Sequence, residues 1–247
     1  MMLSFLLALS LMASPAPAEA HTLQPPDYLY KVTLVRAAPG KLLDLIALYQ
    51  AQAPRYEAQG DAAPLWMRHS QGDHWDLMLI FPMESYPAYY HPERLAQRAA
   101  QAEAQAAFDE TFGQVAAWTE DLFVYGPSFE EVQARYEGAG LFHVEMFKAL
   151  PGKHDELIAQ REMENRYYAG LGHPGNLVFI RDQGGAIDCF TLGFYRDMHH
   201  FAENGDFSFE EEDQAAKAAG FEGVTMISPY LRSLIAYHHD TLAVAIR

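Results

Sequence analysis

The sequence predicts an α+β protein in which one unit of about 112 residues occurs twice, and three observations support this fold class. Pro39-Gly40-Lys41 recurs 112 residues later as Pro151-Gly152-Lys153, as expected after a duplication of such a unit. The same offset of 112 relates further positions: Leu45-Ile46-Ala47 and Leu157-Ile158-Ala159, Tyr56 and Tyr168, Gly60 and Gly172, Leu65 and Leu177, Gln71-Gly72 and Gln183-Gly184, Asp76 and Asp188, Leu122 and Leu234, Tyr125 and Tyr237. Strand-like alternation and helix-like spacing also recur in the same order, which indicates an internal repeat.

Each copy opens with a strand and a helix. Residues 30–36 alternate between two faces, as a half-buried strand does, and residues 142–148 are the counterpart. Pro-Gly ends each strand. Apolar residues then recur at helical spacing, which predicts helices over residues 42–49 and 155–168.

A hairpin, a second helix and a closing strand complete the unit. Residues 65–70 and 74–81 are predicted to form two strands joined at Gln71-Gly72, and the turn at residues 182–185 repeats this hairpin. The second helix is predicted over residues 92–117, and its counterpart begins at Ser208, where Glu211 completes a capping box. Residues 122–125 and 234–237 are predicted closing strands. The resulting β-α-β-β-α-β order is ferredoxin-like, with repeat one at 21–130 and repeat two at 131–247.

The N-terminus predicts export. Residues 5–12 form a short apolar core and Ala18-Glu19-Ala20 is a small-residue cleavage site. The apolar core is shorter than the roughly twenty residues that span a bilayer, so residues 1–20 are predicted to be a cleaved signal peptide rather than a membrane anchor. We therefore expect a periplasmic or secreted protein.

Composition narrows the function classes. The formal net charge of −16 repels phosphate backbones, which argues against a nucleic-acid partner. Cys189 is the only cysteine, so an intramolecular disulfide is excluded. Half of the residues are apolar, which supplies a substantial core. The sequence contains none of the common hydrolase or nucleotide-binding motifs in a usable context.

The strand-Pro-Gly-Lys-helix openings, YKVTLVRAAPGK and FHVEMFKALPGK, resemble those of the dimeric α/β-barrel superfamily. The most similar members are the NIPSNAP-like proteins and the antibiotic-biosynthesis-monooxygenase type. The resemblance implies that the two halves of this chain close one barrel between them, an internal pseudo-dimer, so that a monomer is expected and further dimerisation stays open. It also implies a choice among cofactor-independent monooxygenases, isomerases, haem proteins and members without activity, because this fold does not select one function.

Two pairs of residues are candidates for chemistry. His69 and His74 flank the first hairpin turn, where they would face each other at about 5 Å and could share a metal ion; the alternative is two exposed turn residues. His143 and Glu145 lie two apart on one strand and therefore point to the same side. They could act as a catalytic base and its partner or as metal ligands, or form a polar pair between the halves.

Three further sets of candidates are weaker. Asp76 and Asp188 occupy one position in both copies among apolar neighbours; we assign Asp188 to a catalytic set and Asp76 to a ligand pocket, with a structural role as the alternative. In the same way, Tyr237 is assigned to the catalytic set and Tyr125 to the ligand pocket, with a structural role as the alternative. Trp66 and Arg68 are candidate pocket residues, although such residues are more often core and rim.

The leading hypothesis is an exported barrel that binds a small apolar or aromatic molecule in an aromatic-lined pocket, with an oxidoreductase or isomerase activity that needs no cofactor. The first alternative is a non-catalytic protein-interaction module. The second is a haem-binding barrel, in which His143, His173 or His199 would supply the axial ligand. A divalent metal is a further alternative to the expectation of no cofactor.

Overall fold

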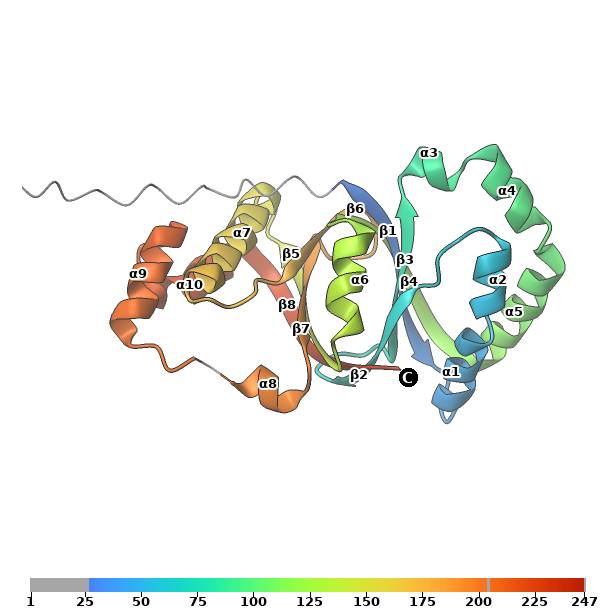
Figure 1. Cartoon of the computed structure of the whole chain (residues 1–247), viewed down its shortest axis with the longest axis horizontal. Coiled ribbons are helices and arrows are strands. Elements are labelled where there is room, and N and C mark those ends of the chain that lie inside the picture. Colours follow the sequence, from blue (N-terminus) through green and yellow to red (C-terminus); the bar gives the residue numbers. More distant parts are fainter. Residues whose placement is uncertain (1–26, 204, 247) are drawn as a thin grey trace, which may run out of the picture.

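The computed structural model describes residues 27–203 and 205–246, and the predicted signal peptide lies outside these ranges. Eight strands close into an antiparallel barrel in the order β1-β3-β2-β8-β5-β7-β6-β4 (Figure 1). The strands are β1 (Tyr28–Ala37), β2 (Leu65–Gln71), β3 (Leu77–Glu84), β4 (Ala116–Gly126), β5 (Leu141–Ala149), β6 (Leu177–Gly184), β7 (Cys189–Tyr195) and β8 (Ile235–Ala245). The two seams between the halves are the antiparallel pairs β2–β8 and β4–β6.

The barrel interior is filled with apolar side chains. Alternate residues of each strand point inward, among them Val32 of β1 and Val144 of β5, which are both fully buried. Phe179 and Phe190 stack in this core with ring centroids 4.6 Å apart. Any sizeable ligand site must therefore lie outside the barrel.

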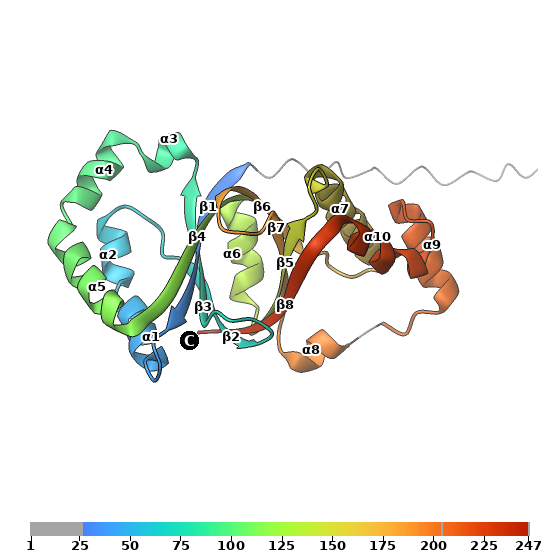
Figure 2. The ribbon, with the colours of Figure 1, turned by 180° about the vertical axis from the view of Figure 1, so that it is seen from behind.

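Helices cover the outside of the barrel on two sides (Figures 1 and 2). The helices of the first half are α1 (Leu42–Gln50), α2 (Ala53–Ala58), α3 (Tyr86–Tyr89), α4 (Pro92–Ala99) and α5 (Ala102–Val115). Those of the second half are α7 (His154–Gly170), α8 (Met198–Ala202), α9 (Phe209–Ala219), the 3-10 turn η1 (Val224–Met226) and α10 (Ile227–Leu234). Between the halves, α6 (Phe129–Glu137) contributes Val132 to the barrel core. Across residues 27–203 and 205–246, no helix combines the length and the apolar character that a bilayer crossing requires.

The two halves share one strand order and, over most of their length, one register. The pair Leu65–Ile80 in the first half corresponds to Leu177–Leu192 in the second, an offset of 112 at both positions. The predicted capping box at the start of α9 is confirmed, because Ser208 and Glu211 exchange both hydrogen bonds. The predicted second helix of the first half differs from the observed one, since it is divided into α4 and α5 at residues 100–101.

The predicted register of the closing strands is wrong. Ala37 pairs with Ala116 and Ala149 pairs with Ile235, so β4 and β8 are related by 235 − 116 = 119 residues rather than 112. The second half carries 119 − 112 = 7 more residues before its closing strand. Leu234 consequently ends α10, and Tyr237 corresponds to Trp118 rather than to Tyr125.

The predicted two-residue turn between His69 and His74 is also wrong. The backbone N–H of His69 donates to the carbonyl of Asp76 at 2.8 Å, so His69 is opposite Asp76. The connection is longer because Trp75 turns inward and is only 1 % exposed. The ring of His69 packs on Trp75 instead of facing His74.

Candidate functional site

A large cavity lies on the outer face of the second half, between strands β5 and β7 and helices α7, α8 and α9. Its volume is about 1210 Å³, which exceeds the roughly 300–1,000 Å³ of common ligand pockets. Aromatic side chains make up much of its wall: Tyr167, Tyr168, Phe194, Tyr195, Phe201 and Phe207. Three histidines, His143, His173 and His200, also line it. The cavity is therefore suited to a flat, largely apolar molecule with a few polar groups.

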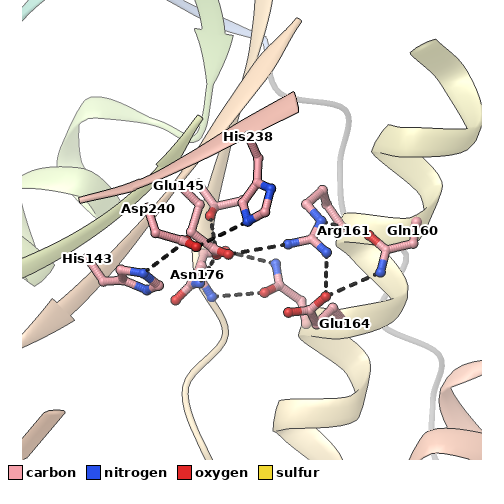
Figure 3. Close-up of polar contacts among 10 residues, drawn as sticks. His143, Glu145, Gln160, Arg161, Glu164, Asn176, His238 and Asp240 are labelled. Atoms are coloured by element: carbon pink, nitrogen blue, oxygen red, sulfur yellow. Dashed lines mark hydrogen bonds and ion pairs between the residues drawn. The ribbon is translucent and has the colours of Figure 1, made fainter. Parts of the chain in front are cut away.

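His143 is a titratable residue of this cavity that has a carboxylate partner. It projects from the outer face of β5, and its Nε2 lies 3.5 Å from Oδ1 of Asp240 on the neighbouring strand β8 (Figure 3). The other carboxylate oxygen of Asp240 is 3.1 Å from Nε2 of His238. Phe201 covers the His143 ring edge-on at 5.5 Å. The imidazole is thus held between a carboxylate and an aromatic wall.

These contacts change the proton affinity of His143. Burial alone would lower the pKa of His143, but the nearby carboxylate of Asp240 and the negative charges of Glu145 and Glu164 outweigh it and raise the pKa above its usual value. The same contact with His143 lowers the pKa of Asp240. His143 is therefore a stronger base than a free imidazole, and its partner Asp240 ionises more readily than a free aspartate.

Glu145 anchors a second polar network behind His143. Oε2 of Glu145 accepts hydrogen bonds from Thr191 Oγ1 at 2.9 Å and from Asn176 Nδ2 at 3.4 Å. Nη1 of Arg161 lies 3.8 Å from its other oxygen. Figure 3 shows Arg161 placed between Glu145 and Glu164.

Arg161 and Glu164 extend this network into helix α7. The Arg161 side chain is only 2 % exposed, donates hydrogen bonds to Glu164 and Gln160, and lies over the ring of Phe147. Burial raises the pKa of Glu164, and the charge of Glu145 adds to this effect against the opposing charge of Arg161. Two carboxylates share one guanidinium here, so the network carries a surplus negative charge that favours a proton on His143.

The first half has a smaller cavity of about 630 Å³ at the equivalent place. With the offset of 112, Lys31 stands for His143, Thr33 for Glu145 and Tyr49 for Arg161. Phe81 lies opposite Lys31, whereas Gly193 lies opposite His143 and leaves more room. Of these two cavities, only that of the second half has a histidine among its described lining residues.

The remaining sequence-predicted residues lie elsewhere. Asp188 accepts a hydrogen bond from the Ala149 N–H at 2.9 Å, and Asp76 accepts the equivalent bond from Ala37 at 2.8 Å. Lys148 and Arg181 also contact Asp188, each at 3.1 Å. In both halves this aspartate accepts a hydrogen bond from the last residue of the first strand, β1 or β5. Neither Asp76 nor Asp188 is among the described lining residues of the two cavities.

Tyr237, Tyr125, Trp66 and Arg68 are likewise absent from the walls of both cavities as described. Tyr237 is 42 % exposed beside His239, and Trp66 packs against Tyr49 in the first half. His74 contacts Asp73 and lies near His239 instead of His69. Of the predicted catalytic residues, the structure brings only His143 and Glu145 to a cavity.

Sequence reasoning missed Asp240, Arg161 and Glu164. One signal was available for Asp240, because His238 and Asp240 are two apart on a strand and must share a face. Its pairing with His143 depends on the register of β5 against β8, which the offset of 112 assigned incorrectly. Nothing in the local sequence around Arg161 distinguishes it from a solvated helix residue.

Comparison with solved structures identifies the fold. An anthrone oxidase-like protein aligns with a TM-score of 0.56 and 14 % identity, over 90 % of this chain and 92 % of that one. A protein provisionally assigned as a monooxygenase from Fusobacterium nucleatum aligns with a TM-score of 0.52 and 10 % identity, over 91 % and 94 % of the two chains. The chain has the dimeric α/β-barrel fold. The fold that the sequence-based resemblance implied is confirmed, although no family model and no curated protein matches the chain.

The expectation that this barrel protein needs no cofactor is not retained. Its structural neighbours include a haem-binding protein from Thermus thermophilus (TM-score 0.42, 10 % identity, 90 % of this chain and 92 % of that chain). They also include a variant chlorite dismutase from Candidatus Nitrospira defluvii (TM-score 0.47, 10 % identity, 91 % and 93 %). The expectation of a cofactor-free protein is withdrawn because of the side chains that line the second-half cavity.

The large cavity of the barrel protein has the donor types that haem requires. His143 and His173 line it and could offer an axial nitrogen, and Arg135 and Arg196 could pair with carboxylate groups. His199 is unsuited to this role, since its side chain is 83 % exposed and paired with Glu203. The side chains that line this cavity are therefore of the types that bind haem.

Proposed function

We propose that this protein binds a small, flat and largely apolar molecule in the second-half cavity and that His143 exchanges a proton with it. The observation that carries the proposal is that His143, which is paired with Asp240, lies in the wall of an aromatic-lined cavity. Reactions that begin by removing a proton from an activated C–H or O–H group, as in isomerases and monooxygenase-like oxidoreductases, suit this arrangement.

The roles of the residues follow from their contacts. His143 would accept the proton, and ionised Asp240 would orient the ring and stabilise the imidazolium that forms. Glu145, held by Thr191 and Asn176, would add negative potential behind the ring. Tyr168 and Phe201 belong to the wall against which an aromatic ring can stack.

A panel of phenols and aromatic ketones, with anthrone included because of the anthrone oxidase-like neighbour, tests the proposal. Binding is measured by calorimetry and turnover by absorbance. His143→Gln should lower kcat by roughly 10²–10⁴-fold with little change in affinity, as expected for loss of a general base. Lys31→Gln, at the equivalent position of the first-half cavity, is the matched control and should leave kcat unchanged. Equal kcat values for the wild type and His143→Gln would refute the role of His143.

Haem binding in the same cavity is the second candidate, favoured by the histidine and arginine side chains in its wall. Bound haem would supply redox chemistry, and His143 or His173 would hold it through a ring nitrogen. Titration of the purified protein with haem should then produce a Soret band that shifts in His143→Ala or His173→Ala but not in His199→Ala. A Soret spectrum identical to that of free haem would exclude this candidate.

We also propose that the two halves arose by duplication and that the protein is exported. The shared strand order and the common offset of 112 over the first three strands of each half support the duplication. Residues 1–20 support export through their apolar core and small-residue cleavage site. Mass spectrometry of protein recovered from the producing cells, with an N-terminus at His21, would support export; an intact N-terminus in the cytoplasm would refute it.

A further inference from the structure

A second cluster of titratable groups lies at the seam between the halves. It consists of Asp73 and His74 from the β2–β3 hairpin and His239 from β8, whose ligand-type atoms all lie within 4.8 Å of one another. Oδ1 of Asp73 is 2.6 Å from Nδ1 of His74, and its Oδ2 is 3.2 Å from Nδ1 of His239. Successive residues of a strand face opposite ways, so His239 points away from the side on which His238 and Asp240 meet His143. This cluster is distinct from the cavity described above.

The carboxylate of Asp73 is buried without a permanent cation. Its side chain is 2 % exposed, and its ion-pair partners in residues 27–203 and 205–246 are the two imidazoles alone. A buried carboxylate normally has a lysine, an arginine or a metal ion beside it, because burial of an unpaired charge is costly. Neutral imidazoles offer nitrogen lone pairs rather than charge, and the net charge of −16 further favours a bound cation.

The backbone holds the three side chains together before any ligand arrives. Gly72 has φ +110°, and a Cβ at this position would lie 2.1 Å from the carbonyl oxygen of Asp240, so the hairpin tip packs directly on β8 beside His239. The Asp73 N–H donates to Nε2 of His69 at 3.1 Å. The ring of His74 packs on Trp118 at 4.9 Å. Such preorganisation lowers the entropic cost of coordination.

We propose that Asp73, His74 and His239 bind a divalent transition-metal ion such as Zn²⁺. Two imidazole nitrogens and one carboxylate oxygen are a donor set that zinc and its first-row neighbours accept, whereas Ca²⁺ and Mg²⁺ prefer oxygen donors throughout. The side chains of His74 and His239 are 53 % and 42 % exposed, which leaves an entry path and room for water as further ligands.

The second half provides an internal comparison. Its hairpin tip, Gly184, approaches β4 just as Gly72 approaches β8. At the positions equivalent to Asp73, His74 and His239, however, the second half has Gly185, Ala186 and Glu120. One ion per chain is therefore expected. Because Asp73 and His239 belong to different halves, the ion would also cross-link the β2–β8 seam.

Zinc titration of the full-length, chelator-treated protein tests the site. Calorimetry at pH 7.5 should show one equivalent bound, and His74→Gln and His239→Gln should each weaken binding at least tenfold. Both side chains are partly exposed, so these variants should fold. The matched control is His199→Gln, an exposed histidine paired with Glu203, which should bind like the wild type.

A second variant separates this site from the other group that could hold a metal, His143, Glu145 and Asp240. His143→Gln should retain zinc binding if the proposal holds; loss of binding in His143→Gln, or full binding in both His74→Gln and His239→Gln, would overturn it. Thermal unfolding gives an independent readout, because an ion that links the halves should raise the Tm of the wild type and not that of His239→Gln. An unchanged wild-type Tm at saturating zinc would refute the cross-link.

Discussion

At the scale of single residues, the proton affinity of His143 is the property that the structure predicts most directly. Asp240→Asn should lower the pKa of His143, because the variant removes the neighbouring negative charge that raises it. Histidine proton resonances followed by NMR across pH 5–9 measure this. Asp44→Asn, which breaks only the exposed pair with Lys41, should leave the titration unchanged. An equal pKa in wild type and Asp240→Asn would contradict the assignment.

The raised pKa also sets the pH dependence of stability. The folded chain holds the His143 proton more tightly than the unfolded chain, so the stabilisation is fully present below the ordinary histidine pKa of about 6.5. It is lost as pH rises through the higher folded-state pKa. The free energy of unfolding of the wild type relative to His143→Gln should therefore fall from pH 6 to pH 9, as urea titrations at both pH values would measure. A pH-independent difference would refute the linkage.

Asp188 should contribute to the free energy of unfolding, and its contribution should be lost at low pH, whereas that of His143 is lost at high pH. Burial alone would raise the pKa of Asp188, but the hydrogen bond from the Ala149 N–H and the charges of Lys148 and Arg181 lower it. Its contribution is thus present above the unfolded-state pKa and lost as pH falls. Asp188→Ala should cost about 1.5–3 kcal/mol at pH 7, the range for hydrogen bonds to charged groups, as measured by urea unfolding. Asp76→Ala, which lacks an arginine partner in its described contacts, should cost less.

The residue scale also shows where sequence reasoning reaches its limit. The two-residue spacing correctly placed His143 and Glu145 on one face, since strand geometry alone decides this. Asp240 and Arg161 reach them from β8 and α7, and such contacts depend on register and helix rotation that no local pattern encodes. Of the cluster of Asp73, His74 and His239, only His74 was a predicted metal ligand, with His69 as its partner, because the contact of His239 with Asp73 also depends on register.

At the scale of elements, the β2–β3 hairpin should be unusually sensitive to substitution at its tip. Gly72→Ala combines a left-handed backbone with a clash against β8, whereas Gly152→Ala combines a left-handed backbone, φ +76°, with open space. The control should cost about 1–2 kcal/mol of unfolding free energy, and Gly72→Ala clearly more. Chemical denaturation of both variants measures the difference. Equal losses would show that Gly72 does not pack against β8 as described.

The order of strands and helices was predictable because it rests on periodicity. Their positions along the chain were predicted incorrectly where one half contains extra residues. The first strands, the first helices and the capping box at Ser208 were predicted close to their observed places. The closing strand of the second half was placed too early, since seven extra residues precede it and an ungapped offset cannot detect them. Helix α6 was missed because it belongs to neither repeat.

At the scale of the whole molecule, the closed barrel should unfold in one step. All three tryptophans, Trp66, Trp75 and Trp118, lie in the first half, so fluorescence reports on that half while far-UV circular dichroism reports on both. The two transitions should coincide, because strands from both halves surround one core.

Phe190→Ala provides the sharper test of this cooperativity. Phe190 is fully buried in the second half, and its truncation should cost about 3–5 kcal/mol. The tryptophan transition should shift to lower urea together with the circular dichroism signal. Leu43→Ala, an exposed first-half position, is the control with little effect. A tryptophan transition unmoved by Phe190→Ala would mean that the halves unfold independently.

Both seams of the barrel join strands of the same polypeptide, and this has a consequence for dilution. A barrel assembled from two chains obeys mass action and falls apart as protein becomes scarce. Here the partner of each half is tethered to it, so the folded fraction should be the same at nanomolar and micromolar protein. The cavity and the seam cluster would then persist at whatever abundance the protein reaches.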